Sequence, residues 1–357
     1  MTGKERISRI LKHQPVDRIG LYEQFWPDTY KDYVEKGKIR GDENFEEHFG
    51  LDIGTCWPFN MIMDLNFITE TICEDENTVT IKDGNGAILR KHKHHDAAPE
   101  HVGFTVKTRE DWDKVKHLLL EYPESRINFE LYRNAKTAAD KTGRFFTWCG
   151  VNVFECMHPV CGHENLLIGM ASDPDWIVDM AETYAGLIIK LQGILFEKEG
   201  LPDGIWYFED MGFKARPFFS PQMYKDMIFP GHKHTMGYAH SIELPIIVHS
   251  CGFVEPLIPG MIEAGVNCLQ AIEIKAGMDL LRIYRQFGDM IALMGGIDIR
   301  KLYTNDKKAI DEELMSKIPI VKQGYGYIAH SDHSIPKTVE YEILKYYMKK
   351  VLELGTY

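Results

Sequence analysis

The chain has 357 residues, of which 44% are hydrophobic and 26% are charged, a composition typical of a soluble globular protein and not of a disordered one. Its formal net charge of −12 makes nucleic acid and anionic membrane surfaces poor partners, because both repel an acidic protein. No signal-peptide-like apolar core and no apolar run long enough to span a membrane is present, so we expect a cytoplasmic protein. The seven cysteines are an odd number spread along a long chain, which favours reduced thiols over a disulfide framework.

The first hundred residues predict a helix, a strand and a hairpin. Residues 3–13 form an amphipathic helical pattern, and a short apolar strand is expected over 18–25. Residues 78–91 alternate apolar and polar side chains around "DGNG" (83–86), which predicts a β-hairpin outside the main repeat. The following "HKHH" (92–95) has charged and polar neighbours, which favour a solvated loop over a metal site.

From about residue 144, short apolar runs alternate with helical stretches. The expected strands are 144–151, 204–210, 244–251, 268–274, 291–298 and 325–332, and the expected helices between them include 173–199, 220–241, 253–264 and 278–287. Continuous apolar strands that alternate with helices indicate a parallel sheet covered by helices.

Ionisable residues stand at the ends of the late apolar runs. They are Glu209, Asp210, His249, Cys251, Glu273, Asp298, His330, Asp332 and His333. In a barrel, the carboxyl ends of the strands converge on one mouth, where catalytic groups from several strands meet. No G-x-G-x-x-G loop opens a helix after the first strand, which disfavours a dinucleotide-binding sheet. We therefore expect a single domain over residues 1–357, of the α/β class, that forms a (β/α)8 TIM-type barrel with an N-terminal helical and hairpin decoration.

His249 and Cys251 lie in "IVHSCGF" (247–253), at the end of one of these runs. Successive side chains of a strand point to opposite faces, so these two side chains share a face and can reach one bound atom. A buried cysteine beside a hydrogen-bonded histidine is the other interpretation of such a pair, and without further context it is the more common one.

Several stretches of the chain resemble the uroporphyrinogen decarboxylase superfamily. They are "KERISRILKHQPVDRIGLY", "FSPQMYKDMIFPGHK", and "VHSCGFVEPLIPGMIEAGVNCLQAIEIKAGMDL" followed by "MGGID". The resemblance covers residues 3–353 and is strongest from 205 to 336. It implies a single TIM-type barrel and one of two activities, that of a porphyrinogen decarboxylase or that of a cobalamin-linked methyltransferase.

The decarboxylase branch of this superfamily has an arginine-rich segment after the first strand, which grips the carboxylates of the substrate. The corresponding stretch here, "YEQFWPDTYKDY" (22–33), has no arginine, and Glu23 and Asp28 would repel a polycarboxylate. Uroporphyrinogen decarboxylase activity itself is therefore not expected. Phe25 and Trp26 fit either an apolar contact surface at the mouth or core packing.

The methyltransferase branch is marked by His-x-Cys at a strand end and by a later cysteine, which together bind zinc. His249 and Cys251 match the first part, and the later position falls on His333, whose imidazole is an equally suitable zinc ligand. The resemblance thus implies Zn²⁺ bound by His249, Cys251 and His333 with an open fourth position. Two imidazoles and one thiolate would leave a positive charge on the complex and make it a stronger Lewis acid. His330, Asp332 and Glu209 are the alternative third ligands, and the first two are also candidates for orienting a liganding imidazole.

The resemblance therefore predicts a zinc-dependent methyltransferase. It would move a methyl group between a small methylated compound or thiol and a corrinoid that a partner protein carries. The methylated form of this corrinoid is methylcobalamin. One version of the reaction is the O-demethylation of an aryl methyl ether. Glu209, Asp210 and Asp298 would position or protonate the reacting group. Glu209 and Asp210 are also candidate metal ligands, and one of these two carboxylates could instead cap the next helix or face solvent, whereas the alternative for Asp298 is a helix N-cap. A metal-free decarboxylase or lyase acting on a non-porphyrin acid is the alternative function, and a corrinoid-binding module without turnover is a third. The sequence leaves open whether the barrel forms a homodimer.

Overall fold

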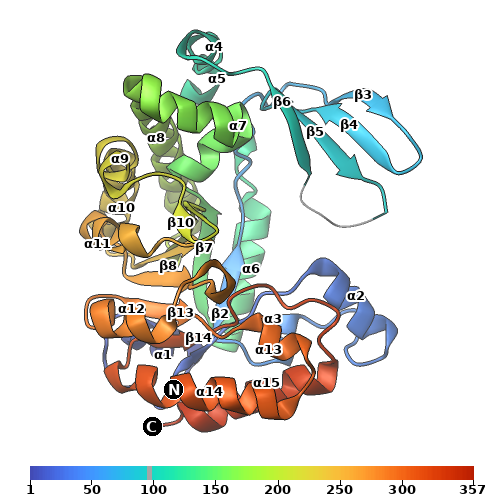
Figure 1. The fold of residues 1–357 in the computed structure, drawn as a ribbon, viewed down its shortest axis with the longest axis vertical. Coiled ribbons are helices and arrows are strands. Elements are labelled where there is room, and N and C mark those ends of the chain that lie inside the picture. The colour runs from blue at the N-terminus through green and yellow to red at the C-terminus, as the bar shows by residue number, and fades with distance from the viewer. Residues whose placement is uncertain (95–98) are drawn as a thin grey trace.

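The computed structural model describes residues 1–94 and 99–357. Eight parallel strands form the central sheet, and helices surround it (Figure 1). In their order around the sheet, the strands are β1 (Gly20–Leu21), β14 (Tyr327–Ala329), β13 (Ala292–Gly295), β12 (Cys268–Ala271), β11 (Ile246–Ser250), β8 (Gly204–Phe208), β7 (Phe145–Val151) and β2 (Ile53–Cys56). The predicted (β/α)8 barrel is confirmed.

Nine of the α-helices in the described residues form the outer layer around the strands (Figure 1). They are α1 (Gly3–Ile10), α6 (Phe129–Thr142), α7 (Val153–Ser172), α8 (Pro174–Glu199), α10 (Phe229–Ser241), α11 (Ile258–Ala264), α12 (Leu280–Phe287), α14 (Lys307–Val321) and α15 (Tyr341–Gly355). The other α-helices of the described residues are α2 (Pro27–Glu35), α3 (Phe45–His48), α4 (Arg109–Val115), α5 (His117–Leu120), α9 (Pro221–Met223) and α13 (Ile299–Tyr303). Within the described ranges, none of these helices combines the length and the hydrophobicity that crossing a membrane would take.

The local sequence explains where the longest helix, α8, begins. Asp173 accepts a hydrogen bond from the backbone N–H of Trp176, and Pro174 occupies the first helical position, where its missing N–H costs nothing. The apolar face of α8, which includes Leu187, Ile188 and Leu191, is buried in the core. Burial of such a face contributes most of the stability of a helix in a folded protein.

A separate antiparallel sheet follows β2 in the chain and projects beside the barrel (Figure 1). Its strands are β3 (Glu70–Glu74), β4 (Thr78–Lys82), β5 (Ala87–His92) and β6 (Glu100–Phe104), paired in that order. The predicted hairpin is the β4–β5 pair, and Asp83 caps its turn by accepting N–H groups of Asn85 and Ala87 at 2.9 and 3.0 Å. Of "HKHH", His92 ends β5 and His94 is exposed, whereas His95 lies outside the described residues.

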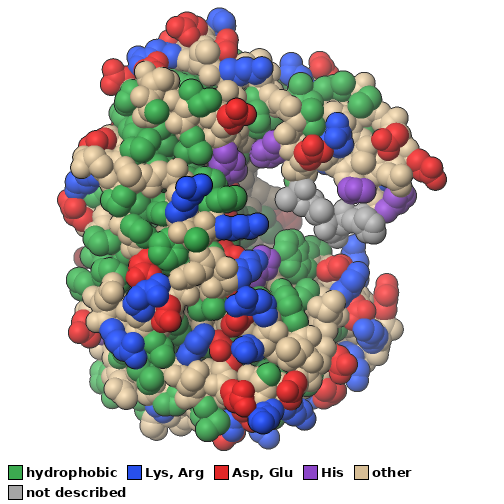
Figure 2. Space-filling model, viewed as in Figure 1, with side chains coloured by type: hydrophobic (Ala, Val, Ile, Leu, Met, Phe, Trp, Pro, Cys, Tyr) green, Lys and Arg blue, Asp and Glu red, His purple; other side chains and the backbone are tan. Residues whose placement is uncertain are grey.

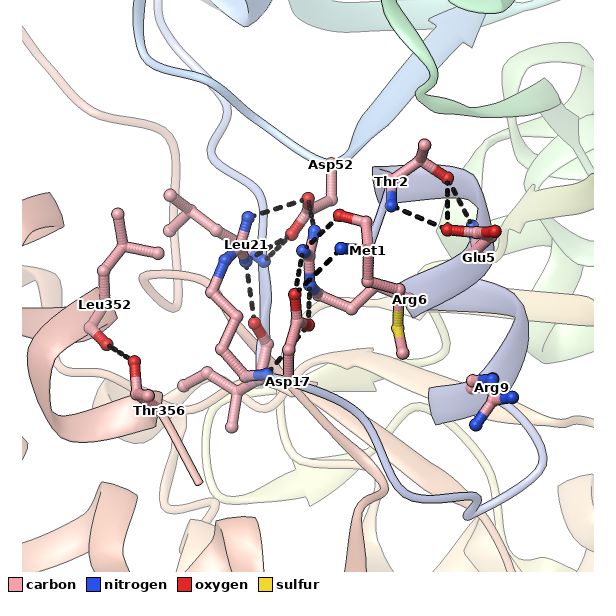
Figure 3. A network of polar contacts seen from close by, with 12 residues as sticks. Met1, Thr2, Glu5, Arg6, Arg9, Asp17, Leu21, Asp52, Leu352 and Thr356 are labelled. Carbon is pink, nitrogen blue, oxygen red and sulfur yellow. Dashed lines mark hydrogen bonds and ion pairs between the residues drawn. The ribbon is translucent and has the colours of Figure 1, made fainter.

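The two ends of the strand order, β1 and β2, meet at a seam where a carboxylate supplements the backbone (Figure 3). The backbone N–H of Asp52 donates to the carbonyl of Leu21 at 2.9 Å, and the N–H of Leu21 donates to the Asp52 carboxylate at 2.8 Å. This buried carboxylate also accepts from Arg6 and Arg18 at 2.6 and 2.7 Å. Asp17 binds the other side of the Arg6 guanidinium at 2.8 Å, so a network of ion pairs joins β1 to β2.

Most observed strands are shorter than the predicted apolar runs, because the polar residues at their carboxyl ends do not pair with the backbone of a neighbouring strand. The run predicted over 204–210, for example, is a strand only as far as Phe208. The following Glu209 and Asp210 therefore lie in the loop at the barrel mouth, together with the corresponding residues of the neighbouring strands.

Candidate metal centre at the barrel mouth

Asp210, His249 and Cys251 form the one group of three or more potential metal ligands found among the described residues. One ligand atom from each side chain lies within 4.8 Å of those of the other two. His249 Nε2 is 3.3 Å from Cys251 Sγ and 3.3 Å from Asp210 Oδ1. The three residues come from the ends of the adjacent strands β8 and β11. We refer to these three residues as the metal cluster.

A chain of buried side chains fixes the orientation of the His249 ring. His249 Nδ1 hydrogen-bonds to Gln270 Oε1, the Gln270 amide nitrogen lies 3.4 Å from His330 Nε2, and His330 Nδ1 contacts the Ser331 carbonyl. Burial lowers the pKa of His330 to about 3, so that ring is neutral near pH 7. Because the Gln270 oxygen only accepts, His249 Nδ1 carries a hydrogen and Nε2 faces the metal cluster. A metal-binding histidine is usually held in this way through its second ring nitrogen.

The charge around His249 Nε2 favours a cation. Burial opposes a charge on this ring, but Cys251 and Asp210 together raise the pKa of His249 well above its ordinary value. A proton and a metal ion compete for the same lone pair of an imidazole. The neighbours that favour the proton would therefore also favour a divalent cation at that position.

Carboxylates on both sides hold the loop that carries Cys251. The N–H of Cys251 donates to Asp210 at 2.7 Å, and the N–H of Gly252 donates to Glu273 at 2.6 Å. Gly252 has φ +79°, and a Cβ atom there would lie 2.5 Å from the carbonyl oxygen of Gly212. The loop after β11 therefore requires glycine, both for its backbone conformation and for its close approach to the loop after β8.

His333, which the resemblance implies as the third zinc ligand, does not belong to the metal cluster. Its ring centroid lies 5.8 Å from that of Trp26, and its Nδ1 is buried without a hydrogen-bond partner. The third residue of the metal cluster is Asp210 instead. From the sequence, this residue was expected to position or protonate the reacting group, or to supply a metal ligand.

The alternative third ligands His330 and Asp332 are also outside the metal cluster. His330 belongs to the chain that orients His249, a role considered from the sequence. The Asp332 carboxylate accepts the N–H groups of Ile274 and Ile299 at 2.8 and 2.9 Å and so ties together the loops after β12 and β13. Burial raises the pKa of Asp332 to about 6.

Glu209 and Asp298 act as helix caps in this structure. Both oxygens of the fully buried Glu209 carboxylate accept N–H groups at the start of α7, from Phe154 at 2.8 Å and Glu155 at 2.9 Å, and His232 Nε2 lies 2.7 Å away. Asp298 accepts the N–H of Arg300 at 3.0 Å and pairs with its guanidinium at 2.7 Å, at the start of α13. The structure therefore places these two carboxylates in the capping role, which was the alternative to a catalytic one.

A cavity of about 700 Å³ lies near the ends of β1 and β2, and a second one of about 620 Å³ has Cys251, Lys214 and Lys275 in its lining. The residues that follow β1 and β2, including Trp26 and Trp57, form much of the wall of the first cavity. Trp57 is linked to the metal cluster through Phe208, whose ring lies 4.4 Å from that of Trp57 and 4.6 Å from that of His249. Figure 2 shows a separate hollow between the barrel and the β3–β6 sheet, with hydrophobic, basic and histidine side chains at its edge.

Sequence reasoning missed Gln270 and Trp57 as residues of the site, and it placed Glu273 at the barrel mouth without giving it a role. Gln270 carried a usable signal, because it is the one strongly polar side chain inside the apolar run "CLQAI" (268–272). A fully buried amide in such a position needs a hydrogen-bond partner. Trp57 follows a strand that the sequence pattern did not reveal.

Comparisons with known proteins agree with this fold. A family model described as "Uroporphyrinogen decarboxylase (URO-D)" matches residues 160–354. A solved "methyltransferase from Methanosarcina mazei" superimposes with a TM-score of 0.65 at 14% identity and covers 99% of each chain, a likeness that shows the fold alone. A Xaa-Pro dipeptidase with bound methionine gives a TM-score of 0.33 at 15% identity, covering 63% of this chain and 59% of its own, which is too low to support an argument. No curated protein matches.

Proposed function

Because the chain belongs to the uroporphyrinogen decarboxylase family, we propose that it is a zinc-dependent methyltransferase that moves a methyl group between a small methylated compound or thiol and a corrinoid carried by a partner protein. The observation that carries this proposal is the metal cluster at the barrel mouth, where a histidine, a cysteine and an aspartate present ligand atoms to one point. A protein of the same fold is described as a methyltransferase, in agreement with the proposal.

The donor set of the metal cluster suits zinc. Zinc binds imidazole nitrogen, thiolate sulfur and carboxylate oxygen, and catalytic zinc sites have three protein ligands and one open position. The His249 side chain is 12% exposed and that of Asp210 is 41% exposed, so the metal cluster is open to the mouth on the side of the carboxylate. With one thiolate and one carboxylate, the ligands balance the charge of Zn²⁺. Such a complex is a weaker Lewis acid than the positively charged one that two imidazoles would give.

Each residue of the site has a separate role in this proposal. A zinc ion held here would act as a Lewis acid towards the heteroatom that gains or loses the methyl group. Gln270 holds His249 so that Nε2 faces the metal cluster, and Asp210 fixes the Cys251 loop through its backbone N–H. His333, with its unpartnered Nδ1, is the alternative to Asp210 as third ligand.

Zinc content tests the proposal and separates the two ligand sets. The wild type is purified without chelators, beside Cys251→Ala, Asp210→Asn and His333→Ala, with Cys73→Ala as a control because Cys73 is exposed. Mass spectrometry should find one zinc ion per chain in the wild type and the control, and none in Cys251→Ala. Loss in Asp210→Asn with retention in His333→Ala supports the ligand set of the structure, and the reverse supports that of the resemblance.

A well-folded wild type that takes up no zinc even after reconstitution would contradict the proposal and favour the metal-free lyase. If zinc is present, methylcobalamin is mixed with a panel of thiols and methoxyarenes, and the cobalt spectrum reports transfer. Zinc binding without any transfer across that panel would favour a non-catalytic corrinoid-binding module.

A further inference from the structure

We propose that the second cavity, whose lining includes Cys251, binds a singly charged anionic group, such as a carboxylate, of a small molecule, and that Lys214 selects this group. The inference rests on the proposed function, because it names the substrate class of the same site: the methylated compound or thiol would be a monoanion. The observations behind it are the place of the cavity at the metal cluster, the two lysines of its lining, and the lack of a counter-charge for one of them among the described residues.

The second cavity borders the metal cluster directly, because Cys251 is part of its lining. Its volume of about 620 Å³ is within the range of small-molecule sites. Apart from Cys251 and Gly252, the lining comes from residues within 212–215, after β8, and within 273–277, after β12. The strands β8 and β12 are the two neighbours of β11 in the sheet, so these segments flank the Cys251 loop on both sides. A molecule in this cavity therefore lies against the face of the barrel mouth that carries the metal cluster.

Lys214 stands at the turn of a short hairpin. The strand β9 (Gly212–Phe213) pairs with β10 (Arg216–Pro217), and Lys214 and Ala215 connect them. The N–H of Ala215 donates to the carbonyl of Ala276 at 3.0 Å, which fixes the turn to the segment after β12. The backbone thus holds Lys214 at the edge of the cavity, although its side chain is exposed.

The lining contains one positive charge without a partner. Lys275 pairs with one oxygen of Glu273 at 3.2 Å, and the other oxygen of this carboxylate accepts the N–H of Gly252 at 2.6 Å. The charge of Lys275 is therefore balanced, and Glu273 is already engaged by two groups. The ammonium group of Lys214, in contrast, forms no ion pair within the described part of the chain.

The metal cluster does not supply the missing counter-charge once zinc is bound, because the charges of Cys251 and Asp210 then balance that of the ion. One uncompensated ammonium group remains, and it fits a ligand with one negative charge. The chain as a whole carries a formal charge of −12, so a positive lining is a local exception. A lysine is a point charge on a flexible stem and not a rigid fork, so Lys214 would select the charge of the ligand and not one exact shape.

Calorimetric titration of the zinc-loaded full chain, without corrinoid, tests the inference with 3-mercaptopropionate and 3-mercaptopropionamide. The two probes have the same thiol and the same carbon chain and differ in charge near pH 7. The titration measures binding and does not depend on methyl transfer. We expect the carboxylate to bind about tenfold more tightly than the amide, as a charge-assisted hydrogen bond allows. The difference should shrink in about 0.5 M salt, because salt screens exposed charges.

Substitution of Lys214 shows whether this residue is the source of the preference. Lys214→Gln should remove most of the preference for the carboxylate, whereas Lys214→Arg should retain it because the charge remains. Lys141→Gln is the matched control, since Lys141 is also exposed and is not part of the lining. All three variants should keep the zinc content of the wild type, because neither lysine belongs to the metal cluster.

Equal affinity of the two thiols, no binding of either, or a preference that persists in Lys214→Gln would overturn the inference. The last result would mean that the carboxylate binds the metal ion itself. Any of these results beside a zinc-containing, methyl-transferring wild type would leave the proposed function standing. A wild type that takes up no zinc would have the opposite meaning: the proposed function fails, and titration with propionate and propionamide decides the anion site alone. Propionate binding that Lys214→Gln removes would support the site, and equal binding of the two would reject it.

Discussion

Substitution of Gly252 by alanine should destabilise the loop that carries Cys251. Gly252 has φ +79°, a conformation that costs an alanine about 1–2 kcal/mol. Its Cβ would also lie 2.5 Å from the carbonyl oxygen and 2.7 Å from the Cα of Gly212, and backbone atoms at that distance must move. Overpacking of this kind costs about 1–3 kcal/mol more. We therefore expect Gly252→Ala to lower the free energy of unfolding by about 2–5 kcal/mol, because both costs apply.

Gly37→Ala is the matched control, since Gly37 has φ +65° and nothing lies within 4 Å of a Cβ atom placed there. Urea unfolding followed by circular dichroism should give a loss of about 1–2 kcal/mol for Gly37→Ala, which is the conformational cost alone. Zinc content should fall in Gly252→Ala and stay unchanged in Gly37→Ala. Equal losses of stability in the two variants would refute the argument that the contact between the loops after β8 and β11 constrains this position.

Three further predictions concern the seam, a buried acid and the orientation of a ligand. Asp52→Asn should lower the free energy of unfolding by about 1.5–3 kcal/mol in urea, because the buried Arg6 loses one of its two carboxylate partners and keeps only Asp17. Burial raises the pKa of Glu23 to about 7, so between pH 4.5 and pH 7 the folded chain holds a proton that the unfolded chain has released. The free energy of unfolding of the wild type should therefore fall by up to about 3 kcal/mol as the pH rises through this range. Urea titrations at several pH values should show this slope in the wild type and not in Glu23→Gln. Gln270→Met should weaken zinc binding by about 10–100-fold in competition with a chelating dye, because His249 loses its orienting partner, and an unchanged affinity would argue against that role.

The barrel could be predicted because its strands are buried on both faces and read as continuous apolar runs, as in "IIVHS" (246–250). The strand β2 escaped prediction because "IGTC" (53–56) is short and contains no apolar run. The outer strands of the small sheet escaped as well, since every side chain of β3 is exposed and shows no alternation of burial. The seam could not be predicted either, because Asp52 and Arg6, which form an ion pair there, are 46 positions apart in the sequence.

The pairing of His249 with Cys251 could be predicted from the two-residue period of a strand, and the structure brings these side chains together. The different positions of Glu209 and Asp210 could not be predicted, although adjacent residues at a strand end point in different directions. One carboxylate enters the start of α7 and the other reaches the Cys251 loop. Which carboxylate goes where depends on the helix and loop that surround them, and local sequence does not contain that information.

The seam between β1 and β2 also joins the two sides of the cavity that Trp26 and Trp57 line. Trp26 follows β1 and Trp57 follows β2, so the two walls belong to strands that are held by ion pairs around Asp52. A full ladder of backbone bonds would hold neighbouring strands at a spacing of about 4.8 Å. Ion pairs between long side chains are less restrictive and weaken with salt when they are partly exposed, as that of Arg18 is. We therefore expect the width of this cavity to depend on ionic strength, and to change with substitutions at Arg6 or Arg18, which do not line it.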